Sequence, residues 1–88
     1  MGSYNIIFKP SVDKDLRALP RAAVSRIMKR VRALASDPFA VQAIKLSGAE
    51  RLYRIRVGDY RIVYEVDQEA MQITVHYVRH RREVYRSL

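Results

Sequence analysis

The chain contains no cysteine, which excludes disulfide bonds, zinc sites built on thiolates and catalysis by a thiol. Its apolar stretches are short, and none approaches the roughly 20 residues that a membrane-spanning helix needs. The first residues do not form a charged segment followed by an apolar one, as a secretory signal would. These absences predict a cytoplasmic protein.

The usual combinations of catalytic residues are also missing. We find no spacing typical of metal ligands, no glycine-rich loop for phosphate, no paired carboxylates and no Ser-His-Asp set. Acidic residues are scarce, because nine Asp and Glu stand against 17 Lys and Arg, giving a net charge of +8. We expect residues 1–88 to form one domain, and on so small a domain this charge favours a nucleic acid or another polyanion as partner. A compact acidic protein would also fit.

The order of predicted elements is strand, helix, helix and then three strands. Residues 3–10 read as a strand, Ser11 as the N-cap of a first helix, and Pro20 as the start of a second helix. After a connection over residues 38–50, three further strands are predicted, at about 51–57, 60–67 and 71–78. This order predicts an α+β domain, with a two-helix hairpin packed on one face of a mostly antiparallel sheet.

The segment YRIRVGDYRIVYE, residues 53–65, predicts a β-hairpin with Gly58 and Asp59 as its loop. Apolar side chains alternate on both sides of the loop, so Val57 should pair with Tyr60. One face of the hairpin should then pack on the helices: Tyr53, Ile55, Val57, Tyr60, Ile62 and Tyr64.

The other face of this hairpin collects positive charge. It pairs Arg56 with Arg61 and places Arg54 opposite Val63. Like charges directly opposite each other destabilise a sheet, so folding does not require this pairing. We interpret the face as a site for phosphate, which arginine binds through two parallel hydrogen bonds. A solvated strand face is the alternative interpretation.

The last strand adds further cations near this face. A turn at Gln68 and Glu69 would place His76 opposite Arg61 in the second hairpin. The strand should then deliver five residues close to the same edge: Arg79, His80, Arg81, Arg82 and Tyr85. A tyrosine or histidine there could move a proton or stack on an RNA base.

The segments YRIRVGDYRIVYEV and VRHRREVY, together with FKPSVDKDLRALP and LSG upstream, resemble the RelE branch of the RelE/ParE toxin superfamily over nearly the whole chain. The resemblance implies a small basic toxin with the RelE-like fold, paired with a cognate antitoxin, and needing no metal or other cofactor. RelE-type members enter the ribosomal A site and cut mRNA there, where the 2′-hydroxyl of the mRNA attacks the adjacent phosphate.

The resemblance also assigns roles to residues. It implies that Arg61 and Arg81 stabilise the phosphorane and that Tyr85 takes the proton of the 2′-hydroxyl. The best-known members carry lysine at the positions of Arg54 and Arg56, and arginine is a poorer proton acceptor, so these two residues are expected to bind rather than act as bases. Four residues are assigned to RNA binding: Arg54, Arg56, His80 and Arg82.

Two other functions remain open at this point. ParE-type members share the fold and poison DNA gyrase, but they generally lack a catalytic tail, so the segment HRREVY argues against this function. A nucleic-acid-binding module without chemistry is compatible with the composition.

Overall fold

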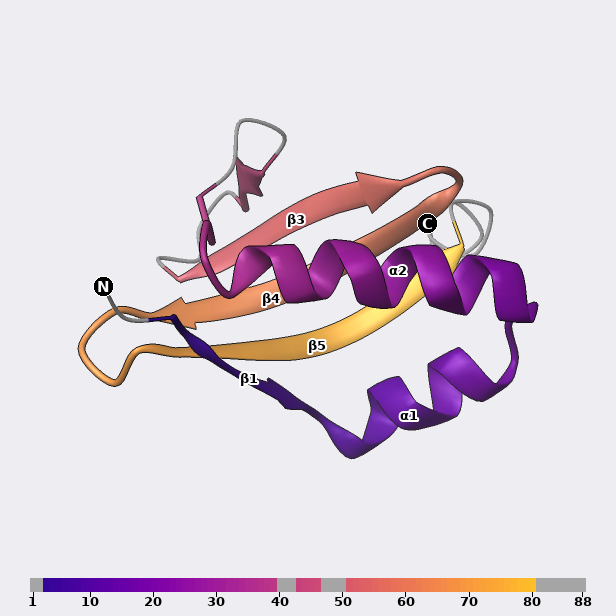
Figure 1. Cartoon of the computed structure of the whole chain (residues 1–88), viewed down its shortest axis with the longest axis horizontal. Helices are drawn as coiled ribbons and strands as arrows, with labels where there is room; N and C mark the ends of the chain where they lie inside the picture. The colour runs from indigo at the N-terminus through magenta and orange to yellow at the C-terminus, as the bar shows by residue number, and fades with distance from the viewer. Residues whose placement is uncertain (1–2, 40–42, 47–50, 81–88) are drawn as a thin grey trace.

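Two helices and five strands make up the fold in the computed structural model, which describes residues 3–39, 43–46 and 51–80 (Figure 1). In chain order the elements are β1 Asn5–Phe8, α1 Pro10–Arg17, α2 Arg21–Leu34, β2 Ile44–Lys45, β3 Leu52–Val57, β4 Tyr60–Asp67 and β5 Gln72–His80. The strands form one sheet in the order β1-β5-β4-β3-β2, in which only the β1–β5 pair is parallel. The predicted fold class is confirmed.

The two helices lie on the same side of this sheet. In Figure 1, α2 crosses β3, β4 and β5, whereas α1 lies beside the second half of β5, just past the end of β1. Each helix turns one apolar stripe toward the sheet, and the buried members of these stripes are Val12 in α1 and Ala23, Ile27, Val31 and Leu34 in α2. Burial of such a stripe supplies most of the stability of a helix this short.

The start of α1 differs from the prediction. The N-cap is Lys9 and not Ser11, because Pro10 already occupies the first helical turn, where its fixed φ is favourable and its missing N–H costs nothing. The Ser11 hydroxyl instead donates a hydrogen bond to the backbone oxygen of His76, at 3.4 Å. Pro20 marks the start of α2 as predicted, as the residue just before Arg21.

The first predicted hairpin is confirmed in its turn and in its register. Val57 pairs with Tyr60 around a loop in which Gly58 has φ of 59°, a left-handed conformation that glycine adopts without strain. The helix-facing side of the sheet forms the core with α1 and α2, and its fully or nearly buried strand residues are Ile55, Ile62, Tyr64, Val66, Ile73, Val75 and Val78.

Tyr64 is the largest buried side chain of this core, with no exposed surface. Its hydroxyl donates a 2.7 Å hydrogen bond to the backbone oxygen of Pro38, just after α2. Burial raises the pKa of Tyr64 to about 12, although the Arg30 charge acts in the opposite direction. The ring of Tyr64 stacks on Tyr53, which meets Phe39 edge-on, so aromatic contacts fasten the end of α2 to β3 and β4.

The second hairpin departs from the prediction. Four residues, not two, separate the closing pair Asp67 and Gln72, and the Asp67 carboxylate accepts a hydrogen bond from the Ala70 N–H at 3.1 Å within the turn. β5 also extends to His80, two residues beyond the predicted end. The pairing of Arg61 with His76 is therefore wrong.

Two further features complete the fold. The short strand β2 pairs with β3 in the stretch that was predicted to be only a connection. Across the described ranges, no helix is long and apolar enough to cross a membrane.

Candidate nucleic-acid interface

Three arginines stand side by side across β3, β4 and β5, on the sheet face opposite the helices. Arg56 is the Cα partner of Arg61, which is in turn the partner of Arg79. Directly opposite side chains in a sheet have Cβ atoms only about 5 Å apart. We call Arg56, Arg61 and Arg79 the arginine row, and the face that carries it the open face.

No carboxylate neutralises this row within residues 3–39, 43–46 and 51–80. The ion pairs of this part of the chain lie elsewhere: Arg17 with Asp13, Arg51 with Asp67, and His76 with Glu65. The adjacency of three full positive charges costs folding free energy, because each like-charged pair destabilises the sheet. The arginine row is therefore a positively charged surface that is suited to bind an anion.

A second row of side chains, formed by Arg54, Val63 and Tyr77, lies next to the arginine row on the open face. Arg54 pairs with Val63, and Val63 pairs with Tyr77 on its other side. Val63 is only 2% exposed, which fits cover by the apolar stem of Arg54 and the ring of Tyr77. The guanidinium carbon of Arg79 lies 4.6 Å from the centre of the Tyr77 ring, a cation–π contact that orients the arginine.

Arg54 carries a donor that the described residues leave unused. Its Nε atom is buried and has no hydrogen-bond partner there. A buried donor left unsatisfied costs on the order of 1–3 kcal/mol, and an incoming phosphate oxygen would relieve that cost. Arg54 therefore fits an anion site better than it fits a purely structural role.

Glu65, an acidic residue of β4, pairs with a histidine and not with the arginine row. Glu65 lies 3.1 Å from Nε2 of His76, so its carboxylate is engaged by an imidazole on the same face. His76 is the residue at which β5 bulges, between the partners of Tyr64 and Val63. It therefore lies near the second row and not opposite Arg61.

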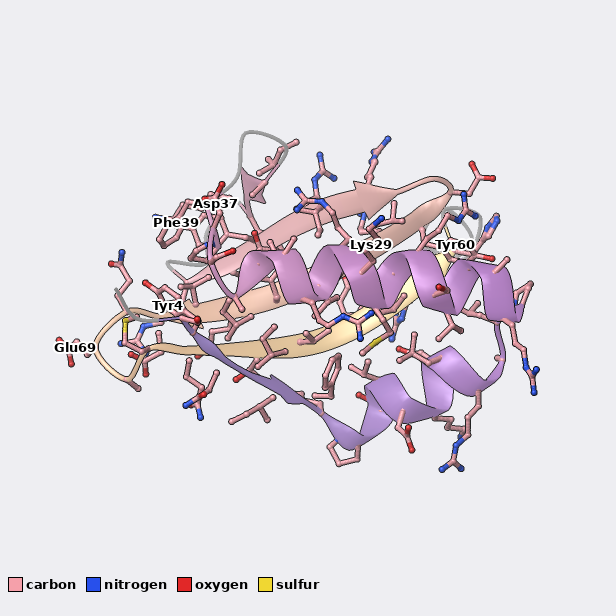
Figure 2. The ribbon with its side chains drawn as sticks, viewed as in Figure 1. Tyr4, Lys29, Asp37, Phe39, Tyr60 and Glu69 are labelled. Carbon is pink, nitrogen blue, oxygen red and sulfur yellow. The ribbon has the colours of Figure 1, made fainter. Side chains whose placement is uncertain are left out.

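His80 is not brought into the arginine row. It pairs with Tyr60, whose ring it meets edge-on with ring centres 5.2 Å apart, on the helix-facing side of the sheet. Figure 2 shows Tyr60 near the end of the sheet where β3 turns into β4, with Glu69 at the opposite end. The assignment of His80 to RNA binding stays a prediction, supported by its place at the end of β5.

Of the seven site residues predicted from the sequence, the structure brings together Arg54, Arg56 and Arg61 on one face. Of the other four, His80 lies opposite Tyr60 on the helix-facing side, and Arg81, Arg82 and Tyr85 lie outside the described residues. The sequence analysis placed Arg79 near this edge but not among the site residues, because no bulge was expected in the last strand, and without the bulge Arg79 would lie on the helix-facing side. No local signal in the sequence marks the bulge, because the α1 side chains that contact β5 there, Ser11 and Asp15, are distant in the chain.

Chemically, the open face can bind and stabilise negative charge. Guanidinium groups stay protonated at every physiological pH, so the row supplies fixed charge and paired donors but no proton acceptor. Such a row can hold successive phosphates of a nucleic-acid strand or stabilise a phosphorane, whose charge is greater than that of its ground state. Across the described part of the chain, no cluster of three or more His, Asp or Glu side chains could hold a metal ion.

Fold and face together define a small basic α+β domain with a row of arginines on its open face, and comparison with known proteins gives the family. Residues 6–85 match the family described as the ParE toxin of type II toxin–antitoxin systems, and the chain belongs to this family. It is a RelE-like toxin, as the sequence resemblance predicted.

Three relatives illustrate this. RelE in the archaeal RelE–RelB complex of Pyrococcus horikoshii is 31% identical, with 90% of this chain and 96% of that chain covered and a TM-score of 0.81. A RelE1 toxin relative from Methanocaldococcus jannaschii is 24% identical over 87 residues, which is 96% of this chain and 97% of the relative. The isolated RelE toxin of E. coli shares the fold, with a TM-score of 0.79 at 24% identity and coverage of 98% of this chain and 100% of that chain.

Proposed function

We propose that this toxin is an endoribonuclease that acts on the ribosome, cutting mRNA in the A site without a metal ion and so stopping translation. The observation that carries the proposal is the arginine row, in which Arg61 stands directly between Arg56 and Arg79 with no carboxylate among the described residues to neutralise it. This arrangement opposes folding and fits a polyanionic substrate.

The reaction is an internal transfer of the phosphoryl group. The 2′-oxygen of the mRNA attacks the adjacent phosphorus, its proton goes to a base, and the bond to the 5′-oxygen of the next nucleotide breaks as that oxygen gains a proton. The products are a 2′,3′-cyclic phosphate and a 5′-hydroxyl. The developing charge on the phosphorane is what fixed cations stabilise most.

We assign the residues accordingly. Arg61, at the centre of the row, binds the reacting phosphate with Arg79 and Arg81. Arg54 and Arg56 hold the flanking phosphates, and Arg82 and His80 extend the contact toward the end of the chain. Tyr85 is the proposed base, because the arginines of the row cannot accept a proton.

A cognate antitoxin is the second proposed partner, besides the ribosome and its mRNA. RelE was solved bound to RelB from P. horikoshii and, at 27% identity to this chain, from E. coli. We propose that an antitoxin of this chain's own system covers the open face or displaces its C-terminal segment, and that the pair resides in the cytoplasm. A structure of that complex with the open face uncovered and the C-terminal segment in place would contradict this mode of inhibition.

Poisoning of DNA gyrase is the second candidate function, because the matching family is described by the name of the ParE toxin. The two functions make opposite predictions in two assays. A gyrase poison changes DNA supercoiling by purified gyrase and leaves mRNA intact. A RelE-type enzyme leaves gyrase unaffected.

The deciding experiment is primer extension on a defined mRNA with purified toxin. The arms are programmed ribosomes, free mRNA in magnesium and free mRNA in EDTA, alongside a gyrase supercoiling assay. We expect cuts at A-site codons in the ribosome arm alone, and their loss in Arg61→Ala, Arg81→Ala and Tyr85→Phe. Absence of cuts from folded protein, or full activity of Arg61→Ala, would contradict the proposal.

A further inference from the structure

β5 contains one residue more than the strand that it pairs with. Tyr64 pairs with Val75 and Val63 pairs with Tyr77, so His76 is an extra residue and forms a β-bulge. A bulge shifts the register by one residue, and therefore moves every later side chain of that strand to the other face of the sheet.

The bulge decides where Arg79 lies. If the register before His76 continued without interruption, Arg61 would face Val78, and Arg79 would stand opposite Tyr60 on the helix-facing side. In the bulged strand, Val78 is 3% exposed in the core and Arg79 joins the arginine row. The third arginine is therefore present on the open face only while the bulge persists.

The bulge lies at an edge of the sheet that α1 covers. β1 ends at Phe8, so from His76 onward β5 has no strand beside it on that side, and α1 lies there instead (Figure 1). Two side chains of α1 bind the backbone groups at this edge. Ser11 donates to the oxygen of His76 at 3.4 Å, and the Asp15 carboxylate accepts the Val78 N–H at 3.2 Å.

Asp15 makes the stronger of these two contacts. It is the shorter one, it is partly buried, and its acceptor is charged, which roughly doubles the strength of a hydrogen bond. This hydrogen bond holds the backbone of Val78, the residue immediately before Arg79. Ser11 lies one helical turn earlier, so both side chains reach β5 from the same face of α1.

We propose that Asp15 is a positioning residue of the RNA site, which holds the Val78 amide and thereby keeps Arg79 opposite Arg61. The proposal rests on the proposed function, in which Arg79 binds the reacting phosphate. Asp15 belongs to α1, which lies on the helix side of the sheet, so Asp15 is not part of the open face. Its effect passes through the backbone of β5.

Kinetics on programmed ribosomes form the first arm of the test. Loss of a transition-state contact lowers kcat, so Asp15→Ala should reduce kcat at least about tenfold with KM changed less than about twofold. Asp15→Asn keeps an acceptor oxygen and should retain activity within about threefold of the unchanged toxin. Asp13→Ala removes an exposed carboxylate from the same helix and should have no effect.

A merely structural role of Asp15 predicts another pattern. Ile27→Val removes one buried methyl group from α2 and lowers stability without removing either contact from α1 to β5. If Asp15 acted only through stability, the two variants should have the same kcat when both are measured under conditions in which they are fully folded. That result, or a native kcat in Asp15→Ala, would overturn the proposal.

The second arm needs no catalysis and uses NMR on the full chain. In Asp15→Ala, the Val78 amide should exchange with solvent faster than in the unchanged toxin, while the Val66 amide keeps its rate. Addition of a short RNA oligonucleotide should shift the side-chain Nε–H signal of Arg79 in the unchanged toxin and not in Asp15→Ala. If the unchanged toxin cuts no mRNA, the proposed function fails, and these two signals still decide whether Asp15 positions Arg79.

Discussion

Removal of the central charge of the arginine row should make the toxin more stable and inactive at once. Arg61 faces a like charge on each side, Arg56 and Arg79. Each such cross-strand pair costs on the order of 0.2–1 kcal/mol, so the two pairs together cost about 0.4–2 kcal/mol. Arg61→Met retains the length of the apolar stem and removes only the charge. We therefore expect its free energy of unfolding to rise by about 0.4–2 kcal/mol at low salt.

The assay is urea unfolding at low salt and at about 1 M salt, where the Debye length falls to roughly 3 Å and the gain should shrink. Arg17→Met is the matched control, since it removes the same net charge but from a cation that pairs with Asp13 at 3.0 Å. That variant should lose at most about 0.5 kcal/mol. If Arg61→Met is no more stable than Arg17→Met at low salt, the like charges of the arginine row do not destabilise the fold, and the argument that the row exists for function fails.

The remaining predictions concern three other positions. Tyr64→Phe should cost about 1–3 kcal/mol at neutral pH, because the Pro38 oxygen loses its buried donor. Burial raises the pKa of Tyr64 from the ordinary tyrosine value of 10.0 to about 12, so Tyr64 contributes stability below pH 10 that is lost as pH rises toward 12. Urea unfolding should show this loss, on the order of 3 kcal/mol at most, in the unchanged toxin and not in Tyr64→Phe. Gly58→Ala should lower thermal stability by about 1–2 kcal/mol, since φ is 59° there; an unchanged melting temperature would contradict it. Arg79→Lys keeps the charge but loses the paired donors and weakens the contact with Tyr77, so kcat should fall while the salt dependence of ribosome binding stays the same.

The first hairpin could be predicted from sequence because local chemistry determines it. Gly58 and Asp59 define a two-residue loop, and the strict alternation on both sides leaves a single register that buries Ile55 and Ile62 together. The charged face of the hairpin follows from the same alternation. Hence the sequence predicts that Arg54, Arg56 and Arg61 share one face, and the register of the hairpin confirms it.

The second hairpin could not be predicted because its register depends on contacts distant in sequence. The bulge at His76 is bound by α1 side chains more than 60 residues away, and its longer turn relies on the side chain of Asp67. The pairing of β2 with β3 has the same cause, since a two-residue strand carries no periodic pattern of its own. The bulge is the reason why Arg79 was not predicted as a site residue.

Folding and function place opposite demands on β3 and β4 but the same demand on β5. In the first hairpin, the core requires alternation and the site imposes like charges opposite each other, at a cost. In β5, an unbulged register would expose Val78, losing roughly 1.5 kcal/mol or more, and would turn the Arg79 charge toward the core, which costs several kcal/mol. The bulge avoids both penalties and completes the arginine row. Variants that weaken the bulge should therefore lose stability and activity together, whereas charge removal in β3 or β4 should separate them.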